Sequence, residues 1–318
     1  MSPLLSDNFQ IAMAHLDANR CGSEEASEMT TISASMVKEL RGRTGLGMME
    51  CKKALQQSEG DMEKAIDDLR KASGLKAAKK SSRVAAEGLV MTKIAEDGNY
   101  GVIVEVNSET DFVARDDSFI DFVKLSLEQA FAEPKACVAE LLDAGLEEKR
   151  QALVQKIGEN ISVRRVDRLA FDDANKGIVE SYVHSNNRIA VLISLQGGDE
   201  SLARDISMHV AALNPMVVRA EDVPEEVLAK ESEIYSAQAR ESGKPEEIIE
   251  KMISGRLRKF VAEVSLLDQP FVKDPDRKVS DLLEEAGADV VSFLRYEVGE
   301  GIDKEEEDFA AGVAAQLK

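Results

Sequence analysis

Aromatic residues and histidine are scarce in this sequence, and each shortage excludes a class of site. Only 4% of the 318 residues are aromatic, and none is tryptophan. Proteins that bind single-stranded nucleic acid stack bases on aromatic side chains, so such a role is disfavoured. The three histidines, His15, His184 and His209, lie in different segments and lack the spacing of metal ligands. We therefore expect no metal site.

Sequence motifs of side-chain chemistry are lacking as well. The cysteines are Cys21, Cys51 and Cys137, an odd number without a Cys-x-x-Cys pair, and we expect free thiols. The sequence has neither the glycine-rich loop of a nucleotide-binding site nor the Gly-x-Ser-x-Gly motif of a serine hydrolase. We predict that the protein is not an enzyme and needs no cofactor.

Basic charge and long apolar runs are also in short supply. Sixty acidic and forty basic side chains leave a formal net charge of -20 and a pI near 4.7. Such a protein repels phosphate backbones and anionic lipids, so we expect no nucleic acid and no membrane as partners. No apolar run approaches the ~20 residues of a membrane-spanning helix, and the N-terminus does not resemble a signal peptide. We expect a cytoplasmic protein.

The N-terminal part of the chain contains helical patterns. Residues 1–31 predict a poorly ordered extension, or an upstream start codon chosen in error. From residue 32, apolar residues recur at helical spacing in three short segments separated by glycine turns. Residues 32–86 are therefore predicted to form a compact three-helix module and a basic linker. The basic stretch 70–83 is interpreted as a solvated linker, with a docking strip for an acidic partner as the alternative.

An internal repeat is the clearest large-scale pattern. Gly88 and Gly177 each open a strand, a polar turn and a second strand, followed by an amphipathic helix. Each copy then closes with a further helix and a third strand. We predict an α+β fold with two halves, residues 87–176 and 177–300, each an antiparallel three-stranded sheet with helices on one face.

Two helical additions complete the predicted architecture. Residues 222–260 have two apolar helical faces separated by a Gly-Lys-Pro break, which is typical of an antiparallel helical hairpin. Two helices alone bury such faces poorly, so the hairpin is expected to pack on a second copy of the chain or on a partner. Residues 301–318 predict a short C-terminal helix that includes Phe309.

The turn after the predicted strand Tyr100–Val106 has two interpretations. It contains Thr110, Asp111, Phe112 and Val113. In the structural interpretation, Thr110 or Asp111 caps the next helix and Phe112 packs on the core. In the functional interpretation, Phe112 wedges into another protein while Asp111 competes for a nearby cation.

Four segments of the chain resemble the bacterial translation elongation factor Ts family. They are Val37 to Leu55 (VKELRGRTGLGMMECKKAL), Thr110 to Val113 (TDFV), Lys156 to Ile161 (KIGENI) and Arg295 to Ile302 (RYEVGEGI). The resemblance extends from about Ile32 to the C-terminus, in the order of the family.

This resemblance implies a guanine-nucleotide exchange factor for the GTPase elongation factor Tu, acting in protein synthesis. Such a factor binds the nucleotide-free GTPase more tightly than its GDP form, and by reciprocity it weakens GDP binding. The resemblance implies that Phe112 enters the GTPase near its magnesium as a wedge, supported by Asp111 and Val113, so that Mg²⁺ and GDP are released.

Further contacts with the GTPase are implied by the resemblance. The helix with Met208 and His209 would press on the nucleotide-binding domain, and Phe309 would contact the GTPase near the C-terminus. The hairpin would act as a coiled coil for self-association into a homodimer. In the N-terminal module the implied contacts are Val37, Leu40, Arg41 and Met48. From pattern alone, His209 and Arg41 can equally be structural residues.

The residue patterns without the resemblance leave a second hypothesis open. A three-helix module like a ubiquitin-associated domain, a duplicated core and a helical hairpin also fit a general scaffold or holdase. An enzyme that uses surface carboxylates has little support.

Overall fold

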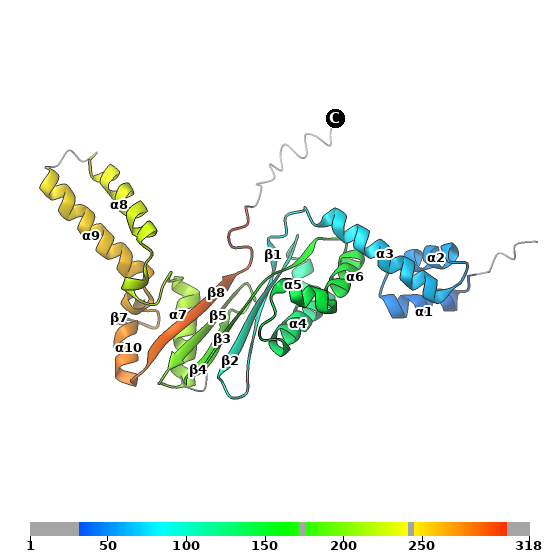
Figure 1. The fold of residues 1–318 in the computed structure, drawn as a ribbon, viewed down its shortest axis with the longest axis horizontal. Coiled ribbons are helices and arrows are strands. Elements are labelled where there is room, and N and C mark those ends of the chain that lie inside the picture. Colours follow the sequence, from blue (N-terminus) through cyan, green and yellow to red (C-terminus); the bar gives the residue numbers. More distant parts are fainter. Residues whose placement is uncertain (1–31, 172–175, 241–244, 304–318) are drawn as a thin grey trace, which may run out of the picture.

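The structure is a computed structural model that describes residues 32–171, 176–240 and 245–303. It is a mixed α and β fold, extended from a helical module at one end to a helical hairpin at the other (Figure 1). The expected extension 1–31 lies outside the described residues. So does most of the expected C-terminal helix, including Phe309.

The N-terminal module consists of three helices, as predicted. They are α1 (Ala34–Thr44), α2 (Met48–Gln57) and α3 (Met62–Lys80). Ser33 and Asp61 cap α1 and α3, because each side chain accepts a hydrogen bond from a backbone N–H, at 3.2 and 2.9 Å. Leu40, Cys51 and Leu55 are fully buried between the helices. The module therefore has a core of its own.

The prediction of a linker over residues 70–83 is wrong. α3 continues through this stretch to Lys80 and packs against α6 (Glu147–Ile157) of the first half. Lysine, arginine and alanine are good helix formers, and Ala77 is buried in the core of the first half. Lys80 donates to the carbonyl of Gly158 at the end of α6. The basic stretch thus joins the module to the first half as a helix.

The first half is an antiparallel sheet in the order β1-β2-β3 with helices on one face. Its strands are β1 (Glu87–Ile94), β2 (Tyr100–Ser108) and β3 (Ile161–Ala170), and its helices are α4 (Asp117–Ala132), α5 (Val138–Leu141) and α6. Val102, Val104 and Val106 of β2 pack with Phe119 and Val123 of α4. These valines form the face of β2 that packs on α4.

The second half repeats this arrangement, so the predicted duplication is confirmed. Its sheet has the order β4-β5-β8. The elements are β4 (Ile178–Val183), β5 (Ile189–Gln196), β8 (Asp289–Glu297), α7 (Glu200–Leu213) and α10 (Val279–Ala286).

Both halves also contain short connecting turns of helix. They are η1 (Val113–Arg115) and η2 (Leu142–Leu146) in the first half, and η3 (Ala220–Asp222) and η4 (Leu266–Asp268) in the second.

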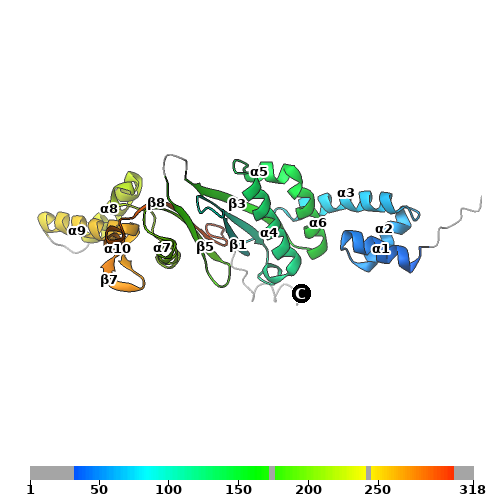
Figure 2. The ribbon, with the colours of Figure 1, turned by 90° about the horizontal axis from the view of Figure 1, so that it is seen from below.

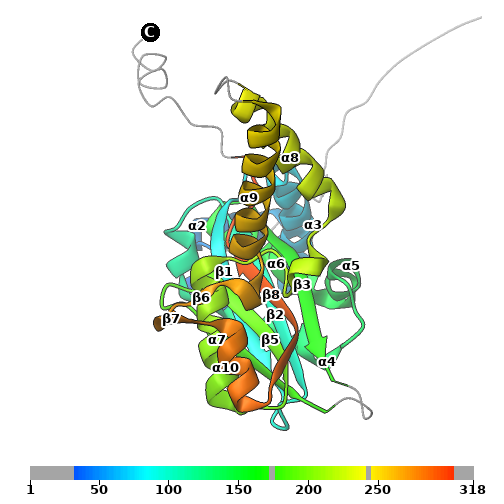
Figure 3. The ribbon, with the colours of Figure 1, turned by 90° about the vertical axis from the view of Figure 1, so that its left-hand side faces the viewer.

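The predicted hairpin is inserted between α7 and α10. It consists of α8 (Glu225–Arg240) and α9 (Glu246–Val264), which project together from the body of the molecule (Figure 3). A small two-stranded sheet of β6 (Pro270–Phe271) and β7 (Asp274–Lys278) follows the hairpin. The sequence pattern did not predict this small sheet, because its strands are too short to show alternation.

The two main sheets pack face to face, with their helices on the outside (Figure 2). Ile103 of β2 and Leu192 of β5 are fully buried in this contact. The hydroxyl groups of Thr92 and Ser181 meet across it at 3.2 Å. Four layers result, helix on sheet on sheet on helix. The sequence predicted the two outer contacts but not the central one.

The contact between the halves is reciprocal. In the first two strands of each copy, equivalent residues are 89 positions apart, as Val90 is from Val179. The N–H of Val90 donates to the carbonyl of Asn187 at 2.8 Å, and the equivalent N–H of Val179 donates to the carbonyl of Gly98 at 2.6 Å. Such exchange of equivalent bonds is the pattern of a two-fold symmetric dimer, found here within one chain.

A buried carboxylate, Glu105, lies between the sheets. It is fully buried and accepts hydrogen bonds from Nη1 of Arg164 at 3.0 Å, from Nε of Arg165 and from the N–H of Gly299 at 2.9 Å. Burial alone would raise its pKa, but these donors outweigh burial and hold the pKa of Glu105 below the usual 4.5. The charged carboxylate joins β2, β3 and the turn after β8.

A β-bulge brings both arginines to this carboxylate. Adjacent strand residues normally point to opposite faces, yet Arg164 and Arg165 both reach Glu105. Glu105 pairs with Arg165, and the next residue of β2 pairs with Val163, so Arg164 is an extra residue in β3. The same shift of register follows Ser194, the equivalent of Glu105 in the second half.

We predict that Gly299→Ala destabilises the protein more than Gly301→Ala. Both glycines have positive φ, 77° and 74°, which costs about 1 kcal/mol for alanine. A Cβ on Gly299 would lie 2.3 Å from the carbonyl oxygen of Ala86, whereas one on Gly301 would meet only the end of Arg164 at 3.9 Å. Gly299→Ala should therefore lose roughly 2 kcal/mol more. Urea denaturation measures both losses, and equal losses would contradict this close approach.

Candidate partner-binding site

The turn that joins β2 to α4 presents one aromatic side chain to solvent. Phe112 is 79% exposed, whereas the next two residues, Val113 and Ala114, are buried in the core of the first half. The interpretation that Phe112 packs on the core is therefore wrong. A large exposed apolar side chain on a well-packed turn is available to a binding partner.

The cap of α4 also differs from the structural interpretation. Asp116, rather than Thr110 or Asp111, occupies the capping position. Its carboxylate accepts hydrogen bonds from the backbone N–H groups of Ser118 at 2.9 Å and Phe119 at 3.4 Å. Thr110 and Asp111 are thus not needed for the helix, and they shape the turn instead.

Two glutamates hold the turn against the loop between α6 and β3. Glu159 accepts hydrogen bonds from the N–H of Thr110 at 3.0 Å and from its hydroxyl at 2.8 Å. In the other direction, Glu109 accepts from the backbone N–H of Asn160. Sequence reasoning noted the segment KIGENI but gave Glu159 no role. The only signal that the sequence offered for Glu159 was its place directly after Gly158, the glycine that ends the helix.

The carboxylate of Asp111, next to Phe112, takes part in an exposed ion pair. Asp111 forms an ion pair with Arg115 at 2.7 Å, and the two side chains are 48% and 77% exposed. An exposed pair of this kind contributes little stability, so its partners separate at small cost. Asp111 can therefore present its carboxylate to a cation or donor of another molecule.

Comparison of the two halves singles out this turn. β2 ends at Ser108 and α4 begins at Asp117, whereas the equivalent β5 ends at Gln196 and α7 begins at Glu200. The same connection is thus made in the second half by a much shorter turn. Residues 109–116 are an enlargement that the second half lacks, and enlarged loops on a rigid scaffold commonly carry function.

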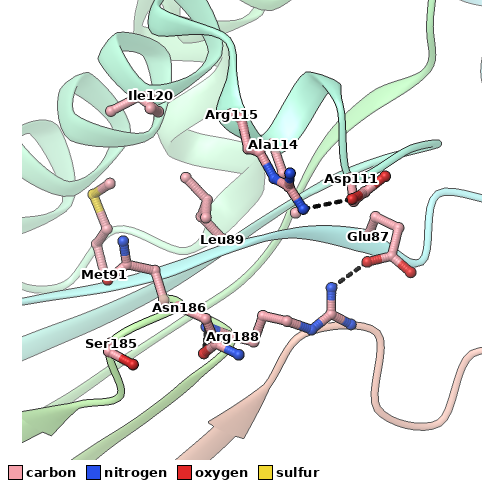
Figure 4. Close-up of a pocket in the computed structure, with 12 residues that line it drawn as sticks. Glu87, Leu89, Met91, Asp111, Ala114, Arg115, Ile120, Ser185, Asn186 and Arg188 are labelled. Carbon is pink, nitrogen blue, oxygen red and sulfur yellow. Dashed lines mark hydrogen bonds and ion pairs between the residues drawn. The ribbon is translucent and has the colours of Figure 1, made fainter.

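A pocket of about 650 Å³ lies beside the turn, where the two halves meet (Figure 4). Its walls come from β1, the turn, α4 and residues 185–188 between β4 and β5. Leu89 and Met91 give it apolar surface, and Arg115 and Arg188 bring positive charge, each paired with a carboxylate. Sequence reasoning gave residues 185–187 only the role of a hairpin turn, and Arg188 that of the first residue of the next strand.

The four residues of the N-terminal module that the family resemblance implies as contacts with a partner fall into two groups. Val37 and Leu40 are buried in the core of the module, so their side chains stabilise it and do not face a partner. Arg41 and Met48 are exposed, Met48 to 60%. Only the second group offers side chains for a direct contact.

His209 is fully buried in the second half, and its neighbour Met208 is half-buried. Nδ1 of His209 accepts from the N–H of Val272 at 3.1 Å, so the neutral ring donates through Nε2 to Oε1 of Gln269 at 2.9 Å. The ring stacks on Phe271. Burial lowers the pKa of His209 below 6.5, and the bond to Gln269 offsets only part of this effect. The side chain therefore supports the fold around α7.

Within residues 32–171, 176–240 and 245–303, no three His, Cys, Asp or Glu side chains gather as metal ligands would. Cys51 and Cys137 are free thiols, and Cys21 lies outside these ranges. Of the helices described, none is long and apolar enough to cross a membrane.

Comparison with known proteins identifies the family of this chain. The family model described as elongation factor TS matches residues 109–300. The chain belongs to the elongation factor Ts family. It is 64% identical over 290 residues to elongation factor Ts of Hahella chejuensis, covering 91% of this chain and 100% of that protein. The elongation factor Ts of Teredinibacter turnerae is 61% identical over 287 residues, covering 90% and 97%.

Membership of the elongation factor Ts family makes this chain a translation elongation factor with a nucleotide-exchange role in protein synthesis. The chain spans essentially the whole of its relatives, including 98% of elongation factor Ts of Saccharophagus degradans, which is 62% identical over 286 residues. The match includes the turn with Phe112, because it begins at residue 109.

We predict that Phe112→Ala leaves the stability of this elongation factor Ts family member nearly unchanged. Because Phe112 is exposed, the free energy of unfolding should change by less than about 0.5 kcal/mol. Val113→Ala is the matched control, and it should lose about 2 kcal/mol since Val113 is buried. Thermal unfolding followed by circular dichroism measures both, and a collapse of stability in Phe112→Ala would restore the core interpretation.

We predict that stability falls as the pH drops below 6.5, in part through His209. Its folded-state pKa is depressed, so the unfolded state takes up the proton more readily. The stabilisation is thus present above the ordinary pKa of 6.5 and is lost as the pH falls towards the folded pKa. Denaturation at pH 7.5 and 5.5 should show a smaller loss in His209→Asn than in the unaltered chain. Equal losses would assign the pH dependence to other groups.

Proposed function

We propose that this chain binds elongation factor Tu in its GDP form and promotes the release of GDP and Mg²⁺ during the elongation cycle. The observation that carries this proposal is the exposed Phe112 on a turn whose neighbours are fixed. An aromatic side chain of this kind inserts into a partner without first leaving its own core. Family membership supplies the class of partner.

The proposed action is a coupling of two binding equilibria. Insertion of Phe112 beside the magnesium site requires a rearrangement of the GTPase, which the bound nucleotide opposes. A factor that binds the rearranged, nucleotide-free form more tightly weakens GDP binding by the same factor. Asp111 assists by offering a competing carboxylate close to the Mg²⁺ ion. The chain makes and breaks no covalent bond in this role.

Other parts of the chain supply further contacts in this proposal. Arg41 and Met48 of the N-terminal module offer exposed side chains. α7, with Met208 at its surface and His209 inside, forms a second contact with the nucleotide-binding domain, and Phe309 adds a contact near the C-terminus. The pocket beside Phe112 continues the same surface into the second half. We further propose that the hairpin associates with a second copy and that the protein works in the cytoplasm.

The test is the release of a fluorescent GDP analogue from elongation factor Tu, with excess unlabelled GDP and Mg²⁺. Catalytic amounts of the unaltered chain should accelerate release, and Phe112→Ala should reduce the acceleration roughly thirtyfold, equivalent to about 2 kcal/mol. Leu75→Ala is a control, because Leu75 is also exposed, to 68%, but belongs to α3 and not to the turn. Binding without acceleration would support a scaffold instead.

A further inference from the structure

The loop between α6 and β3 makes an unusual contact with the turn that carries Phe112. Glu159 comes 49 positions after Thr110, yet its two carboxylate oxygens receive both donors of that one residue. The N–H of Thr110 reaches Oε2 at 3.0 Å, and its hydroxyl reaches Oε1 at 2.8 Å. Hydrogen bonds to a charged acceptor are the stronger kind. One carboxylate thus fixes both the backbone and the rotamer of Thr110.

The remaining polar groups of Thr110 are used within the turn. Its hydroxyl oxygen accepts from the N–H of Val113 at 3.5 Å, and its carbonyl accepts from the hydroxyl of Ser108 at 3.0 Å and from the N–H of Ala114 at 3.4 Å. The backbone on both sides of Phe112 is therefore held, by Thr110 before it and by the buried Val113 after it. The side chain of Phe112 itself projects into solvent.

We propose that Glu159 is a positioning residue for exchange: it acts through Thr110 to hold Phe112 in the conformation that enters the GTPase. This proposal rests on the proposed function. Ordering a loop on binding consumes part of the binding free energy, and a loop that is ordered beforehand avoids that loss. Glu159 sets the turn before the partner arrives, although it does not touch the partner.

The chemistry of Glu159 makes the proposal specific to a carboxylate. In the structure both contacts from Thr110 are donated, and the carboxylate accepts both as a charged group. A glutamine of the same size keeps one acceptor for the N–H of Thr110, but its NH₂ group can meet the hydroxyl only by donating to it, and the charged acceptor is lost. Glu159→Gln therefore loosens the turn with little change in volume. Thr110→Val removes the hydroxyl from the other end of the same contact, and Thr110→Ser keeps both donors.

The experiment is a double-mutant cycle in the GDP-analogue release assay, with Glu159→Gln, Phe112→Ala and the double variant, each also measured by thermal unfolding. Glu159→Gln should reduce the acceleration about tenfold. It should have little further effect in the Phe112→Ala background, because its role passes through Phe112. Glu148→Gln is the matched control: the same change on α6, where Glu148 forms only an exposed ion pair with Arg70. Its acceleration should stay within about twofold of that of the unaltered chain.

Several results would overturn the positioning role. One is a Glu159→Gln variant as active as the unaltered chain. Another is that Glu159→Gln lowers the acceleration of GDP release by the same factor in the unaltered chain and in the Phe112→Ala background. If Glu159→Gln unfolds, Thr110→Val takes its place, with Thr110→Ser expected to restore exchange, and failure of Thr110→Ser to do so would also overturn the proposal. No acceleration by the unaltered chain would instead refute the proposed function, whereas Phe112-dependent acceleration with an additive Glu159 effect refutes the positioning role alone.

Discussion

The buried charge of Glu105 constrains how the two halves fit together. An ionised carboxylate without solvent is tolerated only when donors surround it, and removal of one partner leaves a costly unpaired charge. Its donors come from Asn107 of the same strand, from the bulged strand β3 and from Gly299, after the last strand of the other half. The position of one sheet on the other, and with it the junction that holds the pocket beside Phe112, depends on satisfying this group.

Contacts within the chain explain two family motifs that have no chemistry of their own. Gly299 in RYEVGEGI is placed where only an N–H and no side chain fits, between Glu105 and the carbonyl of Ala86. Tyr296 of the same segment lies under the guanidinium of Arg165 and donates to Asp167 at 2.6 Å. In KIGENI, Gly158 ends α6 in the left-handed region, φ 89°, so that Glu159 meets Thr110. Both motifs position the chain around the candidate site.

Local patterns predicted the elements well, and contacts distant in sequence explain the rest. Helical spacing and turn glycines were sufficient for the three-helix module, the repeat and the hairpin, because these signals lie within a few residues. Residues 70–83 were predicted to be a linker because a run of basic residues is typical of an exposed segment. The burial of Ala77 in the first half depends on tertiary packing, which the local pattern does not show. Phe112 was identified as a candidate, but the sequence left open which residue caps α4. The structure places Asp116 at the cap and leaves Phe112 exposed. Glu159 could not be assigned, because its contact spans 49 positions.

The reciprocal packing of the halves makes the chain a covalent dimer of unequal subunits. A true homodimer would carry the enlarged turn twice, once on each side of its axis, and would offer two identical wedges. Here both halves belong to one polypeptide and are not bound by that symmetry: the connection 109–116 is long in the first half, and the equivalent turn of the second half is short. Under the proposed function, one molecule therefore inserts one such wedge, and the stoichiometry of insertion is one per chain.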